Sequence, residues 1–571
     1  MPLPPRPILT SPQSTSLLGR AQAWHASSET SIGWSVVVAA ILAVMSIPIL
    51  TIVYLAFSPS DNIWSHLVAT VLPQSLQSTL ILMLGTGALT FIIGTASAWL
   101  VTMYRFPGRG VVDRLLVLPL AVPTYIVAYC YVELMDYSGP VQNYLRSTMG
   151  WTSIHDYWFP EIRSLGGAIF VMAVVLYPYV YLSARASFIQ QSVCALEVAR
   201  TLGRTSLGTF WSVALPLARP ALAAGLSLVL MECLNDLGAV QFLGVETLTA
   251  SIYSTWLQRS NLGGAAQIAT IMLMFVVILF ALERFARGRA RHHHTTGRYR
   301  SIPFQDIEGW RGYAAGAICL LPFLAGFVAP FVVLLDHAVT YWQDSFASGF
   351  VAAARNSLLL ACLSATLAVI IAVTLSYARR VANNKFTRPA VRMASLGYAI
   401  PGTVLAIGLL IPLAAFDNMF DGFLHETFGV SVGLLLSGSL IAVALAYVIR
   451  FLAVALGSVE SGLERISPNL DAAARALGES RMSSLLRVHL PLLLPALGTA
   501  ALLVFVDSMK ELPATLLMRP FNFETLATHV YSFASLDQFE EAALGALAIV
   551  MVGLIPVLLL HRTIARGRAG Q

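Results

Sequence analysis

Runs of about twenty apolar residues constrain this chain more than any other feature. They recur along its 571 residues, for example at 34–57, 79–103, 265–282 and 313–335. Each run is long enough to cross a hydrocarbon core of ~30 Å as a helix that rises ~1.5 Å per residue. We count about twelve such runs, six on each side of a polar stretch near residue 300. The sequence therefore predicts an all-α membrane protein with about 12 transmembrane helices.

Composition and charge agree with this reading. Hydrophobic residues make up 57% of the chain and charged residues 11%, far from the balance of an ordinary globular domain. The net charge of +6 does not indicate a nucleic-acid partner, because most Lys and Arg residues fall in the tails and in alternate loops. Cytoplasmic loops carry such an excess. The distribution thus predicts a multi-pass protein in a lipid bilayer with both termini cytoplasmic.

The chain also repeats itself. The segment "LPLAVPTYIVAY" around Pro123 matches "LGYAIPGTVLAI" around Pro401, 278 residues later. A second pair, "TLGRTSLGTFWSVALPLARPAL" and "ALGESRMSSLLRVHLPLLLPAL", aligns with an offset of 275 residues. Because each half has an even number of spans, both halves would run in the same direction, related by an axis along the membrane normal. We expect two pseudo-symmetric six-helix halves.

These observations divide the chain into four parts. We expect a cytoplasmic N-terminal tail at 1–33, a first transmembrane domain at 34–285, a cytoplasmic linker at 286–311 and a second transmembrane domain at 312–571. The linker contains three consecutive histidines, which could bind metal, but a solvated linker explains them equally simply.

Within each repeat, a charged loop lies between the fourth and fifth spans. Its pattern predicts a short helix that ends at Gly203 in the first half and at Gly478 in the second. Glycine permits the left-handed cap that turns the chain. The Leu-Pro pairs at Pro216 and Pro491 would then begin the next helix. The result would be a short helix lying across the inner face of the membrane.

This pattern resembles the EAA loop of the membrane subunits of type I binding-protein-dependent ABC importers. In that family the signature is E-A-A, three residues, Gly, nine residues and Ile-x-Leu-Pro. The first copy departs from it at Val198 and Val213, and the second has Ala472 where the Glu should stand. The residues that carry the match are Glu197, Ala199, Gly203 and Pro216 in the first copy, and Ala473, Ala474, Gly478 and Pro491 in the second.

The resemblance implies what this chain does and with which proteins it works. It implies a permease in the bacterial cell inner (cytoplasmic) membrane, two docking loops for an ATP-binding subunit present in two copies, and a periplasmic substrate-binding protein. Glu197, Arg200 and Arg204, with Arg475 as the counterpart of Arg200, would contact the ATP-binding subunit. The missing Glu at Ala472 suggests that the two docking sites are not equivalent.

The chain shows no engine of its own. A phosphate-binding G-x-x-x-x-G-K-[ST] loop needs a lysine, yet the only lysines are Lys385, after Asn384, and Lys510, after Met509. No nucleophile and base set and no zinc motif stand out. We therefore expect no catalytic residues, no enzyme activity and no cofactor bound by this chain, with ATP used by a partner subunit.

Two acid pairs interrupt the apolar runs. Glu232 and Asp236 lie in the fifth span of the first half, and the offset of 275 carries them onto Asp507 and Glu511. A spacing of four residues would place each pair on one helix face. Ionisable groups in a span usually mark a pathway or a pair, so we expect these acids to face a common passage. The alternative is a structural role near the outer interface, with Lys510 or nearby arginines as partners. Direct metal ligation stays open.

The cargo is suggested by a second resemblance. The segments "ECLNDLGAVQFLGVETLTASIYSTW" and "KELPATLLMRPFNFETLATHVYSF" are similar to those of fused ferric iron permeases. Permeases for thiamine and for aminoethylphosphonate are similar in length and duplication, and the acids favour a cation. A secondary transporter driven by protons would also use membrane acids, but it would leave the paired loops unexplained, as would a membrane scaffold.

Overall fold

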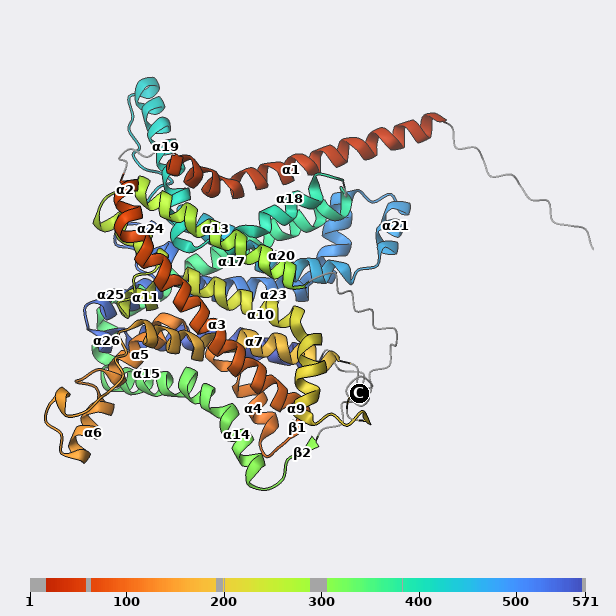
Figure 1. Ribbon diagram of the computed structural model, residues 1–571. Coiled ribbons are helices and arrows are strands. Elements are labelled where there is room, and N and C mark those ends of the chain that lie inside the picture. Colours follow the sequence, from red (N-terminus) through yellow and green to blue (C-terminus); the bar gives the residue numbers. More distant parts are fainter. Residues whose placement is uncertain are drawn as a thin grey trace, which may run out of the picture.

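The computed structural model describes residues 17–57, 63–191, 199, 201–287, 305–382 and 384–566. In these residues, eleven helices are long and apolar enough to cross a membrane, and a bent pair, Arg109–Ala121 with Thr124–Met149, gives a twelfth if it counts as one span. Counted in this way, six spans belong to each half. The expectation of an all-α membrane protein with about twelve spans is confirmed (Figure 1).

The described part of the first half consists of helices and helical turns with one short strand. In chain order these are α1 (Leu17–Phe57), α2 (Trp64–His66), η1 (Leu67–Val71), α3 (Leu72–Met103), β1 (Tyr104–Arg105), α4 (Arg109–Leu115), η2 (Leu118–Ala121), α5 (Thr124–Met135), α6 (Pro140–Met149), η3 (Ile154–Asp156), α7 (Leu165–Gln190), α9 (Ser206–Thr209), η4 (Phe210–Ala214), α10 (Leu215–Asn235), α11 (Gly238–Phe242), α12 (Leu248–Tyr253), η5 (Ser254–Gln258) and α13 (Leu262–Arg287).

The second half repeats much of this order. Its described elements are β2 (Gln305–Asp306), α14 (Trp310–Phe323), η6 (Leu324–Val328), α15 (Ala329–Thr340), α16 (Trp342–Ser345), η7 (Phe346–Phe350), α17 (Val351–Val381), α18 (Thr387–Ala394), η8 (Ser395–Ala399), α19 (Gly402–Phe428), α20 (Leu440–Glu464), α21 (Pro468–Ala476), α22 (Arg481–Ser484), η9 (Leu485–His489), α23 (Leu490–Met509), α24 (Pro513–Met518), α25 (Leu526–Ser535) and α26 (Phe539–Arg566).

The Leu-Pro pairs do not begin helices, which corrects the expectation from the sequence. Pro216 and Pro491 lie inside continuous helical runs, Ser206–Asn235 and Arg481–Met509. In each run a π-helical turn, η4 or η9, directly precedes the Leu-Pro pair. Proline has no N–H to donate and its ring collides with the carbonyl four residues back. A wider π turn moves that carbonyl away, so the helix continues through the proline.

Each half also contains a break at the start of its third span. A 3-10 turn, η2 or η8, leads into Pro123 or Pro401, whose backbone is extended, and the next helix starts one residue later. These are the two prolines that the repeat aligned in the sequence. The break therefore places the N-termini of α5 and α19 at corresponding positions of the two halves.

The two halves interlock rather than lying side by side as separate bundles. Helix α1 packs on α19 of the other half, and α26 packs on η2 of the first half. Two glycines allow the backbones to approach. A Cβ atom on Gly408 would lie 2.3 Å from the carbonyl oxygen of Pro48, and one on Gly553 would lie 2.4 Å from that of Ala121. Any larger residue at either position would force the halves apart.

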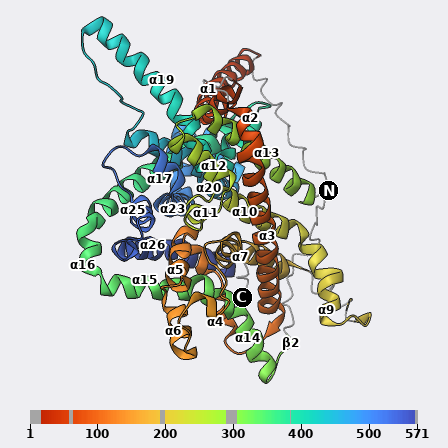
Figure 2. The same ribbon diagram turned by 60° about the vertical axis from the view of Figure 1, so that its left-hand side comes forward.

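The ends of the molecule differ. In Figures 1 and 2, α6 and the far end of α19 project from one end, whereas α9 lies at the opposite end, as does α21 in Figure 1. Helix α1 begins inside the segment expected to be a tail, at Leu17. Residues 288–304 of the expected linker, with the three histidines, lie outside the described residues. Where the description resumes, β2 pairs in parallel with β1.

Candidate functional site: a central acidic cavity and two inner loops

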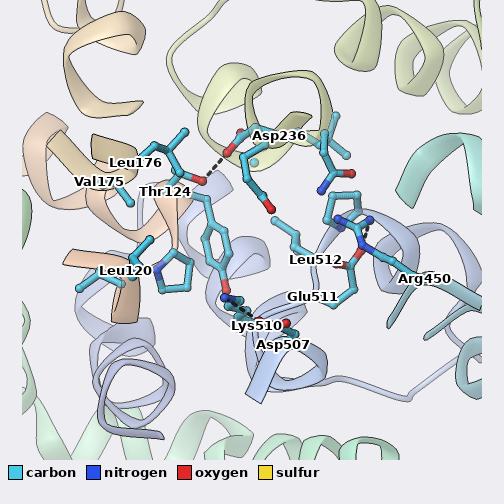
Figure 3. Close-up of a pocket in the computed structure, with 18 of the residues that line it drawn as sticks. Leu120, Thr124, Val175, Leu176, Asp236, Arg450, Asp507, Lys510, Glu511 and Leu512 are labelled. Atoms are coloured by element: carbon cyan, nitrogen blue, oxygen red, sulfur yellow. Dashed lines mark hydrogen bonds and ion pairs between the residues drawn. The ribbon is translucent and has the colours of Figure 1, made fainter. Parts of the chain in front are cut away.

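A cavity of about 110 Å³ lies where the two halves meet. It is bounded by the breaks before α5 and α19 and by the ends of α10 and α23 (Figure 3). All four acids expected to share a passage line this one cavity. Their convergence agrees with the pseudo-symmetry read from the sequence, while their role in transport remains a prediction.

The acids of the second half are paired with bases of the same half. The Nζ atom of Lys510 lies 2.9 Å from Oδ1 of Asp507, and Nη1 of Arg450 lies 3.1 Å from Oε1 of Glu511. Arg450 and Glu511 are 6% and 5% exposed. Figure 3 shows both ion pairs at the cavity wall. A buried acid in such a pair is already compensated in charge.

The acids of the first half are held by neutral donors instead. The hydroxyl of Tyr398 donates to Oε1 of Glu232 at 3.1 Å. Asp236 accepts a hydrogen bond from the hydroxyl of Thr124 and another, of 2.8 Å, from the backbone N–H of Ala239. Among the described residues, no basic side chain lies within ion-pair distance of either acid.

The repeat explains this difference. Subtracting the offset of 275 residues from Arg450 and Lys510 leads to Val175 and Asn235, and all four residues line the cavity. The acids are thus duplicated and the bases are not. Four carboxylates face two basic side chains, so acid is in excess and lies on the side of the first half.

Within each pair, the two acids do not share a helix face, contrary to the expectation from their spacing. Glu232 and Asp507 lie on α10 and α23, but Asp236 and Glu511 follow the last residues of these helices. Each carboxylate accepts an N–H group of the short helix that comes next, Ala239 of α11 or Ala514 of α24. These bonds stabilise the start of the next helix and end the long one.

Three residues at this site were not anticipated from the sequence. Lys510 was foreseen as a possible partner, but Arg450, Tyr398 and Thr124 were not. An arginine within the apolar run of α20 is a signal of its own, and Arg450 could have been found in this way. The tyrosine and the threonine carry no such signal, because their importance comes from packing between distant segments.

The second inner loop is anchored by charge. Asp471 on α21 lies 2.8 Å from Nε of Arg380 on α17 and 2.7 Å from Nε2 of His489, which precedes α23. The backbone carbonyl of Asp471 accepts a 3.1 Å bond from Nε of Arg475. The side chain of Asp471 is 27% exposed and that of His489 is fully buried. The loop helix is therefore tied to two spans.

Both loops end in the left-handed cap expected from their glycines. The φ angles are +81° at Gly203 and +80° at Gly478. The N–H of Arg204 donates to the carbonyl of Ala199 at 3.1 Å, and the N–H of Glu479 donates to that of Ala474 at 3.0 Å. Ala199 and Ala474 are buried. Ala473 lies one residue earlier on α21, whereas the expected contact residues Glu197 and Arg200 lie outside the described residues.

The first loop is joined to the second half by the strand pair. The hydroxyl of Tyr104 on β1 donates to Ser206 at 2.8 Å, and Ser206 donates to Oε1 of Gln305 on β2 at 2.9 Å. Ser206 is the first residue of α9, directly after the loop. The positions that match Arg380 and His489 by the repeat hold Thr102 and Ala214. The two loops thus have different supports.

Known proteins that resemble the chain cover most of it. The Fe(3+)-transport system permease protein FbpB 2 of Haemophilus influenzae is 25% identical over 493 residues, 86% of this chain and 90% of that protein. The ferric transport system permease protein FbpB of Actinobacillus pleuropneumoniae is 21% identical over 497 residues, 82% and 68% of the two chains. The sulfate transport system permease protein CysT of Salmonella typhimurium is 30% identical over 216 residues, 35% and 73%.

A family model matches the chain twice, at residues 88–292 and 364–569. The two matches fall in the two halves, and each contains one inner loop and one acid pair. Together they cover more than half of the sequence. The chain belongs to the family of inner membrane components of binding-protein-dependent transport systems.

Proposed function

We propose that this chain is the permease of an ATP-driven importer of ferric iron, which a periplasmic binding protein delivers. The observation that carries the proposal is the likeness to ferric permeases across both halves, over 82% to 86% of the chain. The sulfate and 2-aminoethylphosphonate permeases match only 35% of it.

The cavity supports a cationic cargo. Four carboxylates and two basic side chains line it, and carboxylate oxygens suit hard cations. Sulfate and phosphonate carry negative charge and would be repelled by the excess acid. Family membership also argues against the proton-driven secondary transporter, since transport in this family depends on a binding protein.

The inner loops would connect this cavity to the energy source. Two copies of an ATP-binding subunit would dock on them at the cytoplasmic face, where both termini would also lie. Glu197, Arg200 and Arg204 would contact one copy and Arg475 the other. Closure of the subunits would move α10 and α23, whose far ends carry the acids, and so open the cavity alternately to the two sides. Each partner must favour one of the two conformations, because a partner that binds both equally shifts nothing.

The test is reconstitution of the chain with its ATP-binding subunit and binding protein in liposomes. We expect the ferric-loaded binding protein to stimulate ATP hydrolysis and iron uptake, and the empty protein or a sulfate-loaded one to do so much less. Stimulation by an anion-loaded binding protein, with none by the ferric form, would overturn the assignment.

A further inference from the structure

Two buried polar atoms at the cavity lack a hydrogen-bond partner within the described residues. They are the hydroxyl of Tyr125 and Nε of Arg450. Tyr125 is 5% exposed and Arg450 is 6% exposed. A buried polar atom without a partner is destabilising, and such atoms are few in folded proteins. Beside an open space, they mark where a ligand supplies the missing hydrogen bonds.

The acids around the same space are already held by protein donors. Tyr398 fixes Glu232, and Thr124 with Ala239 fixes Asp236. Asp507 and Glu511 are tied to Lys510 and Arg450. To ligate one bare metal ion together, several carboxylates would have to leave these donors. They can accept hydrogen bonds from the outside of a metal's water shell without moving.

We propose, given the cationic cargo assigned above, that the cavity binds a trivalent metal ion with its water shell in place. Glu232 and Asp236 accept hydrogen bonds from metal-bound water. The hydroxyl of Tyr125 and Nε of Arg450 donate to metal-bound hydroxide, which a hydrated ferric ion carries near neutral pH.

Space and charge fit this mode of binding. The cavity of about 110 Å³ has room for an ion with several waters, since ~10–15 Å³ already holds one water molecule. The uncompensated acids lie on the first-half side, so the positive ion faces Glu232 and Asp236. Recognition then depends on the charge and hydrated size of the ion and not on direct ligation.

Terbium(III) tests the proposal, because it is a hard trivalent ion whose emission lifetimes in ordinary and heavy water report how many waters remain bound to it. The full chain in nanodiscs of zwitterionic lipid is titrated with terbium, and the bound fraction is measured. We expect bound terbium to keep its full water shell, and cobalt(III) hexaammine, whose ligands do not exchange, to displace it.

Variants place the bound ion in the cavity. Glu232→Gln with Asp236→Asn should weaken binding by about ten- to a hundredfold, as expected when hydrogen bonds to a charged ligand are lost. Tyr125→Phe, a milder change, should weaken it several-fold. The matched control is Glu426→Gln with Asp344→Asn, two exposed acids that do not line the cavity, and it should bind as the unchanged chain does.

Three results would overturn the inference: terbium that loses water on binding, terbium that the hexaammine fails to displace, or binding that the cavity variants leave unchanged. Iron uptake in liposomes separates this inference from the proposed function. If uptake succeeds and terbium binds without its water, only the inference fails. If terbium binds hydrated and ferric iron is not transported, the ferric assignment fails and the cavity remains a site for hydrated cations.

Discussion

The two acid pairs occupy matching positions in the repeat, yet they are electrically different. Asp507 and Glu511 in the second half have basic partners at 2.9 Å and 3.1 Å. Glu232 and Asp236 in the first half accept hydrogen bonds from hydroxyl and amide groups. The duplication kept the acids and changed their surroundings. One pair can therefore serve structure while the other faces the cargo, a division that neither half alone would show.

The largest effect should come from breaking the structural pair. Arg450→Met leaves Glu511 buried without its base, and removal of one partner of a buried ion pair costs about 3–5 kcal/mol. We expect a large fall in the melting temperature of the purified chain. Adding Glu511→Gln should recover most of the loss. If Arg450→Met alone is as stable as the unchanged chain, the structural role of this pair is wrong.

The second change makes the first half resemble the second. Asn235→Lys places a lysine three residues after Glu232, as Lys510 follows Asp507. The new base should neutralise the cargo-facing acid and lower ferric uptake by about ten- to a hundredfold, since each tenfold is ~1.4 kcal/mol. Stability should change little. Asn235→Gln is the neutral control, and equal uptake by the lysine and glutamine variants would remove the distinction between the pairs.

A third change addresses the inner loops, which also differ between the halves. Asp471→Asn removes the charge that holds Arg380 and His489 and should loosen α21. We expect ATP hydrolysis to continue while iron uptake per ATP falls several-fold, because a buried donor that loses its partner costs ~1–3 kcal/mol. Simultaneous measurement of hydrolysis and uptake checks this. A parallel fall in both rates would point to lost docking instead.

The smallest effect should come from the two loop caps. Alanine at Gly203 or Gly478 would have to adopt φ angles of +81° and +80°, which costs roughly 1–2 kcal/mol for a residue with a Cβ atom. The space around both glycines is open, so backbone strain is the whole effect. We expect binding of the ATP-binding subunit to weaken several-fold, more at the loop that depends on its cap. Unchanged binding in both variants would show that the caps do not position the loops.

The repeat allowed much of the site to be predicted from the sequence. One offset carried Glu232 and Asp236 onto Asp507 and Glu511, and the structure places all four at one cavity. The glycine caps were predicted because positive φ is a local property of the backbone. The membrane fold followed from the length of the apolar runs.

What could not be predicted depends on contacts between distant segments. Tyr398 reaches Glu232 across 166 residues, from the other half, and no local pattern sets that register. The ends of α10 and α23 were missed because a four-residue spacing of acids fits a helix as well as a helix followed by a capping carboxylate. The prolines were misplaced because π turns allow a helix to continue where proline usually starts or ends it.

The most direct test of the account is ATP-dependent uptake of radioactive ferric iron by liposomes that contain the chain, its ATP-binding subunit and the ferric-loaded binding protein. We expect uptake by the unchanged chain and by the control Glu426→Gln with Asp344→Asn. Uptake should fall at least about tenfold in Glu232→Gln with Asp236→Asn at equal amounts of inserted protein. Equal uptake by all three would contradict the assignment of the first-half acids to the iron pathway.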